Sequence, residues 1–261
     1  MMLFKPALSY YLFSSHRRGR GLHNPFARQL IREVFNDRTK YDAYGLMHNA
    51  RKEYLKSKEK IRMLDMGAGS KKQNKSNTRK VRNIVRLSSG KPKYHHLLYR
   101  MVSFNKPAVM LEAGTSLGLG TMALALGNPE GKVYTIEGDP SSAALAEKLF
   151  TQNNIPNITL LTGSFRKMFP QVFARADHAG FVFLDGHHEE KATLEYFETL
   201  LPHLSDKSIL VIDDIHWSQG MLRAWNTIRQ HSAVSLTIDI FRMGFVFFNP
   251  DLPGQTLKIR F

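Results

Sequence analysis

The sequence has no cysteine and no long apolar run. Since none of its 261 residues is cysteine, disulfides, thiolate metal sites and a cysteine nucleophile are excluded. No apolar run approaches the ~20 residues that a membrane-spanning helix requires. The opening stretch, MMLFKPALSYYLFSSHRRGR, has its basic cluster after the apolar patch and no small-residue cleavage site, which argues against a signal peptide. We therefore expect a cytoplasmic protein with no transmembrane segment.

Acidic residues are scarce in the first part of the chain. Residues 1–100 hold 24 Lys and Arg against 6 Asp and Glu, whereas residues 101–261 hold 13 against 16. The formal net charge of +15 therefore belongs to the N-terminal part. Such a surface either suits anionic partners, such as nucleic acid, lipid headgroups or phosphorylated substrates, or is merely solvated. Aromatic side chains interleave with the basic ones and either stack on bases or fill the cores of short helices (Tyr41, Tyr44, Tyr54, Tyr94, Tyr99).

Hydrophobic periodicity divides the chain into a basic helical region, residues 1–104, and an alternating α/β domain, residues 105–261. The first region is expected to hold helices at 24–35, 42–58, 78–87 and 93–104. The second is expected to hold strands at 108–112, 132–137, 157–161, 180–185 and 208–213, and helices near 119–127, 140–153, 190–202 and 218–231. Residues 234–241 and 245–248 flank a turn as a hairpin, and residues 256–261 alternate like an added edge strand.

A glycine-rich loop joins the first two predicted strands of the α/β domain, in AVMLEAGTSLGLGTMALALGNPEGKVYTIEGDP. Glu112 and Gly114 end the first strand, Gly118 and Gly120 follow in the turn, and Glu137 ends the second strand. Such a unit directs backbone N–H groups at a helix N-terminus toward a ligand. It also places a carboxylate where a ribose diol would lie. The alternative is an ordinary βαβ unit whose glycines only permit tight turns.

This pattern resembles motif I and the following acid of class I S-adenosylmethionine-dependent methyltransferases, because the gap from Gly114 to Gly118 exceeds that of a dinucleotide fingerprint. The resemblance implies a Rossmann-like seven-stranded methyltransferase sheet, with five parallel strands and a C-terminal antiparallel hairpin. It implies S-adenosyl-L-methionine as cofactor. The implied cofactor contacts are Glu112, Gly114, Thr115, Ser116, Gly118, Gly120, Glu137, Gly138, Ser164, Phe165 and Asp185.

Three neighbouring features are open to a structural interpretation. Phe165 either lies against the adenine ring or belongs to the core, and Asp139 before Pro140 is expected to cap a helix. A second glycine-rich loop, residues 65–70, is followed by polar and basic residues without a strand and terminal acid. We interpret it as a turn or as a loop near the active site.

Two later strand ends carry carboxylates and histidines, in FVFLDGHH and ILVIDDIHW. Buried carboxylates are costly unless they are paired or bound to metal, and three of them suit Mg²⁺. Helix capping and loop hydrogen bonding are the structural alternatives. The predicted metal ligands are Asp185, Asp213 and Asp214, and the predicted catalytic residues are His188, Asp185 and His216.

These strand ends resemble those of catechol and caffeoyl-coenzyme A O-methyltransferases, which carry an Asp after strand four and an Asp-Asn pair after strand five. Asp185 and Asp213 match, whereas Asp214 stands where the family has asparagine, which leaves the metal open. His188 stands at the place of the catechol enzymes' catalytic lysine. A histidine there can act as a general base near neutral pH.

The sequence therefore predicts an S-adenosylmethionine-dependent O-methyltransferase of a small molecule, with assistance by Mg²⁺ or a similar ion as an option. One alternative acceptor is RNA or another anionic polymer held by the basic region; the absence of cysteine excludes cytosine-C5 methylation. Another alternative is a Rossmann module that binds a nucleotide without methylation. GLHNPF, DDIHW and KIRF also resemble an uncharacterised bacterial group of methyltransferases. A homodimer is compatible with the sequence.

Overall fold

The computed structural model describes residues 10, 14, 24–63, 78–252 and 254–261. The predicted loop at 65–70 and the basic cluster at 16–20 lie outside these residues. The described residues form two compact units. One comprises residues 38–176, and the other comprises the described residues up to 37 together with residues 177–261. The predicted domain boundary after residue 104 stays a prediction.

The 38–176 unit has a parallel sheet in the order β3-β4-β5. Its strands are β3 (Val109–Ala113), β4 (Lys132–Glu137) and β5 (Ile158–Thr162). Leu111 pairs with Tyr134, and Ile136 pairs with Leu161. The connecting helices are α6 (Leu119–Gly127) and α7 (Pro140–Gln152), and α8 (Phe165–Phe173) follows β5. Parallel strands joined by crossover helices bring their carboxyl ends to one edge of the sheet.

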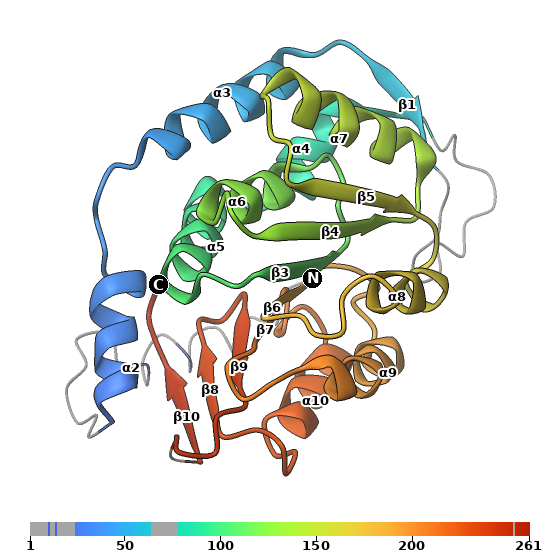
Figure 1. Ribbon diagram of the computed structural model, residues 1–261. Helices are drawn as coiled ribbons and strands as arrows, with labels where there is room; N and C mark the ends of the chain where they lie inside the picture. The colour runs from blue at the N-terminus through green and yellow to red at the C-terminus, as the bar shows by residue number, and fades with distance from the viewer. Residues whose placement is uncertain (1–9, 11–13, 15–23, 64–77, 253) are drawn as a thin grey trace. The chain divides into compact units, whose positions relative to one another are not determined.

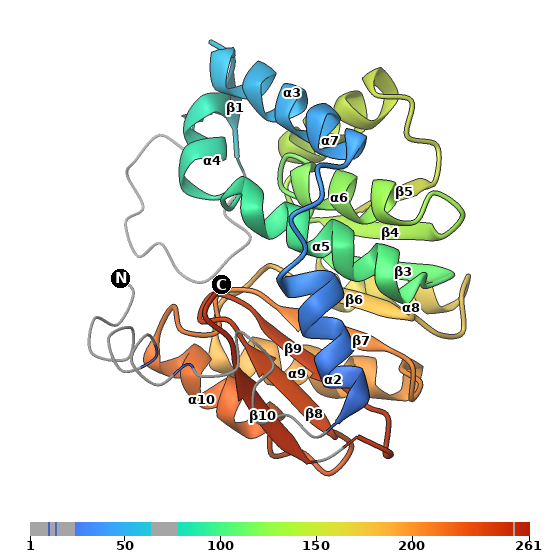
Figure 2. The ribbon, with the colours of Figure 1, turned by 90° about the vertical axis from the view of Figure 1, so that its left-hand side faces the viewer.

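Three more helices of this unit precede the sheet: α3 (Asp42–Lys56), α4 (Val81–Leu87) and α5 (Pro92–Asn105). α5 and α6 pack side by side, and α3 packs against α4 and α6 (Figures 1 and 2). A two-stranded antiparallel ribbon joins β1 (Lys60–Arg62) to β2 (Thr78–Lys80). Helix α5 contributes a run of buried apolar residues that includes Leu97, Leu98 and Met101. The basic helices therefore bury an apolar face and are part of a packed core.

The second unit has a mixed sheet in the order β10-β8-β9-β7-β6. The strands are β6 (Phe181–Leu184), β7 (Ile209–Ile212), β8 (Leu236–Asp239), β9 (Gly244–Phe247) and β10 (Gln255–Lys258). β6 and β7 are parallel, β9 is antiparallel to both β7 and β8, and β10 is parallel to β8. The helices are α2 (Pro25–Leu30), which continues as a π-helical turn (Ile31–Phe35), α9 (Glu190–Leu200) and α10 (Gln219–Ile228), with a 3₁₀ turn at Leu201–His203.

Alternate residues of β9 show that both faces of this sheet are covered, because side chains of a strand alternate between faces. Phe245 and Phe247 make edge contacts with Phe35 and Phe26 of the α2 segment, at ring distances of 5.4 Å and 5.6 Å. At Gly244, by contrast, a Cβ atom would lie 2.5 Å from the indole ring of Trp225 in α10. The sheet is therefore enclosed by α2 on one face and α10 on the other (Figure 2).

The predicted fold class is confirmed, and most elements lie within two residues of their predicted bounds. Three parallel strands in one unit and two in the other are the five predicted ones, and β8–β9 is the predicted hairpin. β10 is the predicted added edge strand. Residues 78–80, predicted as the start of a helix, instead form β2, and helix α8 was not predicted. No helix within the described ranges is both long and apolar enough to cross a membrane.

Candidate active site

The loop between β3 and α6 has a backbone that favours glycine at its bends. Gly114 and Gly118 have φ angles of 113° and 81°, and Ser116 between them has a φ of 50°. Gly118 also caps α6, where a Cβ atom would lie 2.6 Å from the ring of Phe150. Positive φ is strained for residues with a Cβ. The loop is therefore shaped by its glycines, and α6 starts directly after it.

A buried hydrogen-bond chain fixes the loop to the sheet. Glu112, which is 1% exposed, accepts hydrogen bonds from the hydroxyls of Thr121 and Thr135, the latter at 2.6 Å. The hydroxyl of Thr115 in the loop lies 2.6 Å from that of Thr135. Burial raises the pKa of Glu112 to about 7, against the opposing effect of the two hydroxyls and with a further rise from the charge of Glu137. Glu112 therefore lies beneath the loop, is connected to it through threonine hydroxyls and is shielded from solvent.

The carboxylate of Glu137 lies at the end of β4 and contacts the same loop. The Ser116 N–H donates to one carboxylate oxygen at 2.6 Å, and the Asp139 N–H donates to the other at 2.9 Å. Burial raises the pKa of Glu137, while the N–H groups of Asp139, Ser116 and Gly138 oppose that rise. Each oxygen has lone pairs beyond the one that its N–H group uses. The structure therefore brings together the glycine loop and the acid that the sequence assigned to a ribose diol.

The remaining predicted cofactor residues of this unit lie on α6 and α8. Gly120 is in the first turn of α6, and Ser164 precedes the first residue of α8. Phe165 is 6% exposed, and its ring stacks on Phe169 at 6.1 Å, as expected of a core residue. Asp139 accepts a hydrogen bond from the Ser142 N–H at 2.8 Å, so its predicted capping role is confirmed.

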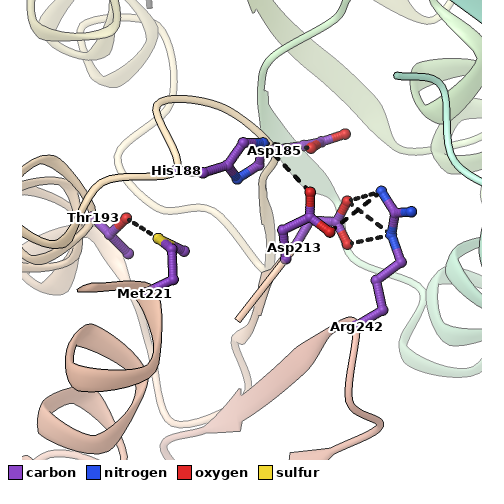
Figure 3. Close-up of polar contacts among 7 residues, drawn as sticks. Asp185, His188, Thr193, Asp213, Met221 and Arg242 are labelled. Atoms are coloured by element: carbon purple, nitrogen blue, oxygen red, sulfur yellow. Dashed lines mark hydrogen bonds and ion pairs between the residues drawn. The ribbon is translucent and has the colours of Figure 1, made fainter. Parts of the chain in front are cut away.

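The other predicted residues belong to the second unit, where an arginine contacts two of the three predicted carboxylates. Asp213, 1% exposed, follows β7 and accepts from Arg242 Nε at 2.9 Å and from Arg242 Nη2 at 2.6 Å. The same Nη2 lies 3.7 Å from Asp214 Oδ1. Figure 3 shows the guanidinium facing the Asp213 carboxylate. We call Asp185, His188, Asp213, Asp214 and Arg242 the Asp213 cluster.

His188 completes the Asp213 cluster from the loop that follows β6. Its Nε2 lies 3.7 Å from Asp185 Oδ1 (Figure 3). The same Nε2 lies 3.8 Å from Asp214 Oδ2. The His188 side chain is 30% exposed, so its ring is accessible to a ligand. Two carboxylates thus lie beside the Nε2 of an accessible imidazole. The arrangement can therefore accept a proton at Nε2 and stabilise the resulting charge.

Burial and the ion pair between Arg242 and Asp213 have the largest effects on the pKa values in the Asp213 cluster. Burial raises the pKa of Asp214, and the charge of Asp213 raises it further, whereas Arg242 and His188 lower it. Burial lowers the pKa of Arg242, but its hydrogen bonds to Asp213 and the charges of Asp213, Asp214 and Asp185 outweigh burial and leave it above its ordinary value. Arg242 thus stays cationic, and Asp213 is its principal partner.

The three carboxylates do not fit the divalent ion considered from the sequence. Both oxygens of Asp213 accept hydrogen bonds from Arg242, so its carboxylate faces a guanidinium. A metal needs such oxygens as ligands, and it would have to lie beside a fixed positive charge. Among the described residues, no group of three or more His, Asp or Glu side chains is arranged to hold a metal.

His216, predicted as catalytic, lies in a buried part of the second unit. His216 is 8% exposed, its Nε2 lies 3.0 Å from Asp239 Oδ2, and its ring stacks on Phe241 at 4.7 Å. Its Nδ1 is buried and has no hydrogen-bond partner among the described residues. The neighbouring Trp217 is 44% exposed and therefore lies outside the core. A catalytic role for His216 stays a prediction, whereas its pairing with Asp239 is a structural contact.

Sequence reasoning did not identify Arg242 or the threonines beneath the glycine loop as site residues. Arg242 was assigned only to the turn of a hairpin, and it lies 29 positions from Asp213. In the sequence, Arg242 is distinguished only as a basic residue in a turn beside an apolar strand. Thr121 and Thr135 had no signal, because hydroxyls on a buried helix and strand are common structural features.

Comparison with known proteins supports the resemblance found in the sequence. Residues 111–215 match the family model of a methyltransferase domain. A probable O-methyltransferase of Mycobacterium tuberculosis is 29% identical over 143 residues, which are 47% of this chain and 60% of that protein. The transmembrane O-methyltransferase of Homo sapiens is 36% identical over 87 residues, which are 32% of this chain and 30% of that protein. The chain therefore spans less than two thirds of the length of these relatives.

A solved structure resembles this chain over a larger share of its length. The O-methyltransferase from Bacillus cereus in complex with SAH superposes with a TM-score of 0.56 at 17% identity and covers 83% of this chain and 95% of that chain. This likeness bears on the fold and confirms the Rossmann-like class. The predicted resemblance to class I methyltransferases is confirmed for residues 111–215, which include Glu112, Glu137 and Asp213 but not Arg242.

Proposed function

We propose that this protein transfers a methyl group from S-adenosyl-L-methionine to an oxygen of a small molecule. The observation that carries the proposal is the Glu137 carboxylate, which follows β4 and is held against the glycine loop by the Ser116 N–H at 2.6 Å. A ribose diol needs such a carboxylate at the end of the second strand. The match of residues 111–215 to a methyltransferase domain supports this cofactor over a nicotinamide.

The residues of the 38–176 unit fit this cofactor. Gly118 packs so closely against Phe150 of α7 that the loop from Gly114 to Gly118 lies tight against the core, and α6 begins directly behind it. Backbone N–H groups at the start of α6 suit the carboxylate of a methionine moiety. Bound S-adenosylmethionine would supply a sulfonium methyl that an acceptor oxygen attacks in line, so that a C–O bond forms and the C–S bond breaks.

Proton handling is assigned to the second unit. His188 Nε2 takes the proton from the acceptor hydroxyl, and the carboxylates of Asp185 and Asp214 stabilise the imidazolium that results. Asp213 does not handle the proton, because Arg242 occupies both of its oxygens. These groups account for the proton of an acceptor hydroxyl without a metal-bound intermediate.

Calorimetric titration with S-adenosylmethionine tests the cofactor assignment. We expect micromolar binding by the wild type, in EDTA as in Mg²⁺, and roughly 10- to 100-fold weaker binding by Glu137→Ala, since a hydrogen bond to a charged group contributes about 1.5–3 kcal/mol. Glu137→Gln preserves one acceptor oxygen and guards against loss of the loop. Glu147→Ala, an exposed acid on α7, is the control. Tighter binding of a nicotinamide cofactor would instead support a non-methylating nucleotide-binding module.

A second candidate function, methylation of RNA or another anionic polymer, is favoured by a separate cavity in the 38–176 unit. The cavity, of about 360 Å³, lies between α3 and α5. Lys40 and Arg51, three histidines (His48, His95 and His96) and two tyrosines (Tyr41 and Tyr44) line it, and none of the lining residues that the structure describes is acidic. The Tyr44 ring stacks on His96 at 3.8 Å. Aromatic faces and cations are the combination that holds single-stranded nucleic acid.

Fluorescence anisotropy with a labelled oligouridylate tests this second function. Binding should weaken steeply as salt rises, and Lys40→Glu should weaken it several-fold more than Lys52→Glu, an exposed position of α3 outside the cavity. Equal effects of both substitutions would indicate nonspecific attraction. Absence of binding at low salt would remove the polymer acceptor and leave the small molecule.

We further propose, from the sequence alone, a cytoplasmic bacterial protein, and a homodimer stays a prediction. Size-exclusion chromatography with light scattering measures the mass against the 29.8 kDa of one chain.

A further inference from the structure

One cation is already present among the carboxylates of the Asp213 cluster. Arg242 contacts both oxygens of Asp213 and lies 3.7 Å from Asp214 Oδ1, and the charges of Asp213, Asp214 and Asp185 together stabilise its guanidinium. The Arg242 side chain is 18% exposed and that of Asp213 is 1% exposed, so solvent screens this pair weakly. The strand ends that resemble metal-binding ones therefore carry their own positive charge.

We propose that the guanidinium of Arg242 takes the place of a divalent cation in the Asp213 cluster, so that the acceptor step needs no metal, and that removing this side chain turns the cluster into a site for Mg²⁺ or Mn²⁺. The statement about the acceptor step rests on the proposed function. The statement about cation binding depends only on the geometry of the second unit.

Bidentate pairing explains why the guanidinium excludes a metal. Nε and Nη2 donate in parallel to the two oxygens of Asp213, which is the fork geometry that arginine forms with a carboxylate. A divalent ion would have to displace both hydrogen bonds and then lie next to the displaced charge. The backbone of Asp213 is held at the end of β7, because its N–H donates to Leu184 O at 2.9 Å.

A purely structural role for Arg242 is the competing explanation, since the residue lies in the turn between β8 and β9. The backbone already anchors this turn: the Ile215 N–H donates to Arg242 O at 3.1 Å, and the Ile240 N–H donates to Met243 O at 3.0 Å. The side chain is therefore not needed to hold the hairpin. Its role is to neutralise the neighbouring carboxylates, because its Nη2 lies 2.6 Å from Asp213 Oδ2 and 3.7 Å from Asp214 Oδ1.

Mn²⁺ titration of the full-length protein, followed by electron paramagnetic resonance, tests the proposal. We expect no saturable site in the wild type below millimolar Mn²⁺. Arg242→Ala should gain one site with at least tenfold tighter binding, and Mn²⁺ should raise the thermal midpoint of this variant alone. Arg242→Lys, which keeps a positive charge, should bind no better than the wild type. Arg223→Ala removes an exposed arginine that pairs with Glu190 and is the matched control.

The outcomes separate this proposal from the proposed function, because none of them requires activity or S-adenosylmethionine. A gain of Mn²⁺ binding in Arg242→Ala that Asp213→Asn abolishes supports the exchange of cations. A micromolar site in the wild type, equal binding in Arg242→Lys and Arg242→Ala, or no site in any variant overturns it. Arg242→Gln is measured in the same way if circular dichroism shows that Arg242→Ala does not fold.

Discussion

At the scale of single residues, Glu112 is a buried acid of the 38–176 unit whose pKa is raised. It is buried and accepts hydrogen bonds from two threonine hydroxyls. Burial raises its pKa from 4.5 to about 7, so it changes protonation near neutral pH. Its position beneath the loop means that this change acts on the loop and not directly on a ligand.

We predict that Glu112 makes stability depend on pH. Because its folded pKa of about 7 lies above the ordinary 4.5, the folded protein keeps a proton that the unfolded chain releases. The resulting stability is complete below pH 4.5 and is lost as the pH rises to 7, by up to about 3 kcal/mol. Urea unfolding of the wild type and Glu112→Gln between pH 5 and 8 measures it. The variant should lack this fall in stability; an identical fall in both proteins would refute the assignment to Glu112.

At the scale of elements, α6 depends on the glycine at its N-terminus. Gly118 has a φ of 81° and lies against Phe150 of α7, so two independent features exclude a side chain there. Gly45 is the contrasting case, because it lies inside α3 with open space around its Cα. Substitution by alanine should therefore destabilise the protein at Gly118 and stabilise it at Gly45.

We predict that Gly118→Ala lowers the free energy of unfolding by about 1–3 kcal/mol, from the strain of positive φ and of overpacking. Gly45→Ala should raise the free energy of unfolding by about 0.5–1 kcal/mol, because alanine favours a helix interior. Chemical denaturation of both variants gives the two values. A neutral Gly118→Ala would show that the turn relaxes away from Phe150.

Local patterns explain which elements could be predicted. The strands from β3 to β7 are short apolar runs between turn residues, and Asn24-Pro25 and Asp139-Pro140 mark helix starts that the structure confirms. Helix α8 contains Pro170 in its interior. Because proline usually disrupts a helix, the sequence does not predict one there. β1 and β2 pair through only three residues each, with Lys60 opposite Lys80, and such distant pairing leaves no local pattern.

The same difference between local and distant contacts explains which parts of the candidate site could be predicted. Glu137 and the glycine loop lie within one βαβ unit, so the sequence alone placed them together, and the N–H of Ser116 confirms the contact. Arg242 reaches Asp213 only because β9 runs antiparallel to both β7 and β8. Strand order across a hairpin is set by packing of the whole sheet. No pattern near Asp213 could therefore reveal the cation.

At the scale of the whole molecule, the predicted cofactor contacts are unevenly divided between the units. All of them except Asp185 belong to the 38–176 unit. Hydrogen exchange should therefore respond to SAH mainly there. We predict slower exchange in peptides covering 112–120 and 137–139, lost in Glu137→Ala, and little change at 236–247. Protection confined to the second unit would contradict the assignment of the cofactor.

The ion pair between Arg242 and Asp213 determines how the Asp213 cluster obtains its positive charge. A divalent ion has to be acquired from solution, and copper or zinc can displace it by binding more tightly. A guanidinium is made with the chain, stays charged at every physiological pH and cannot be exchanged. A protein with this arrangement is ready for use once it has folded, in cells starved of magnesium or burdened with foreign metals alike.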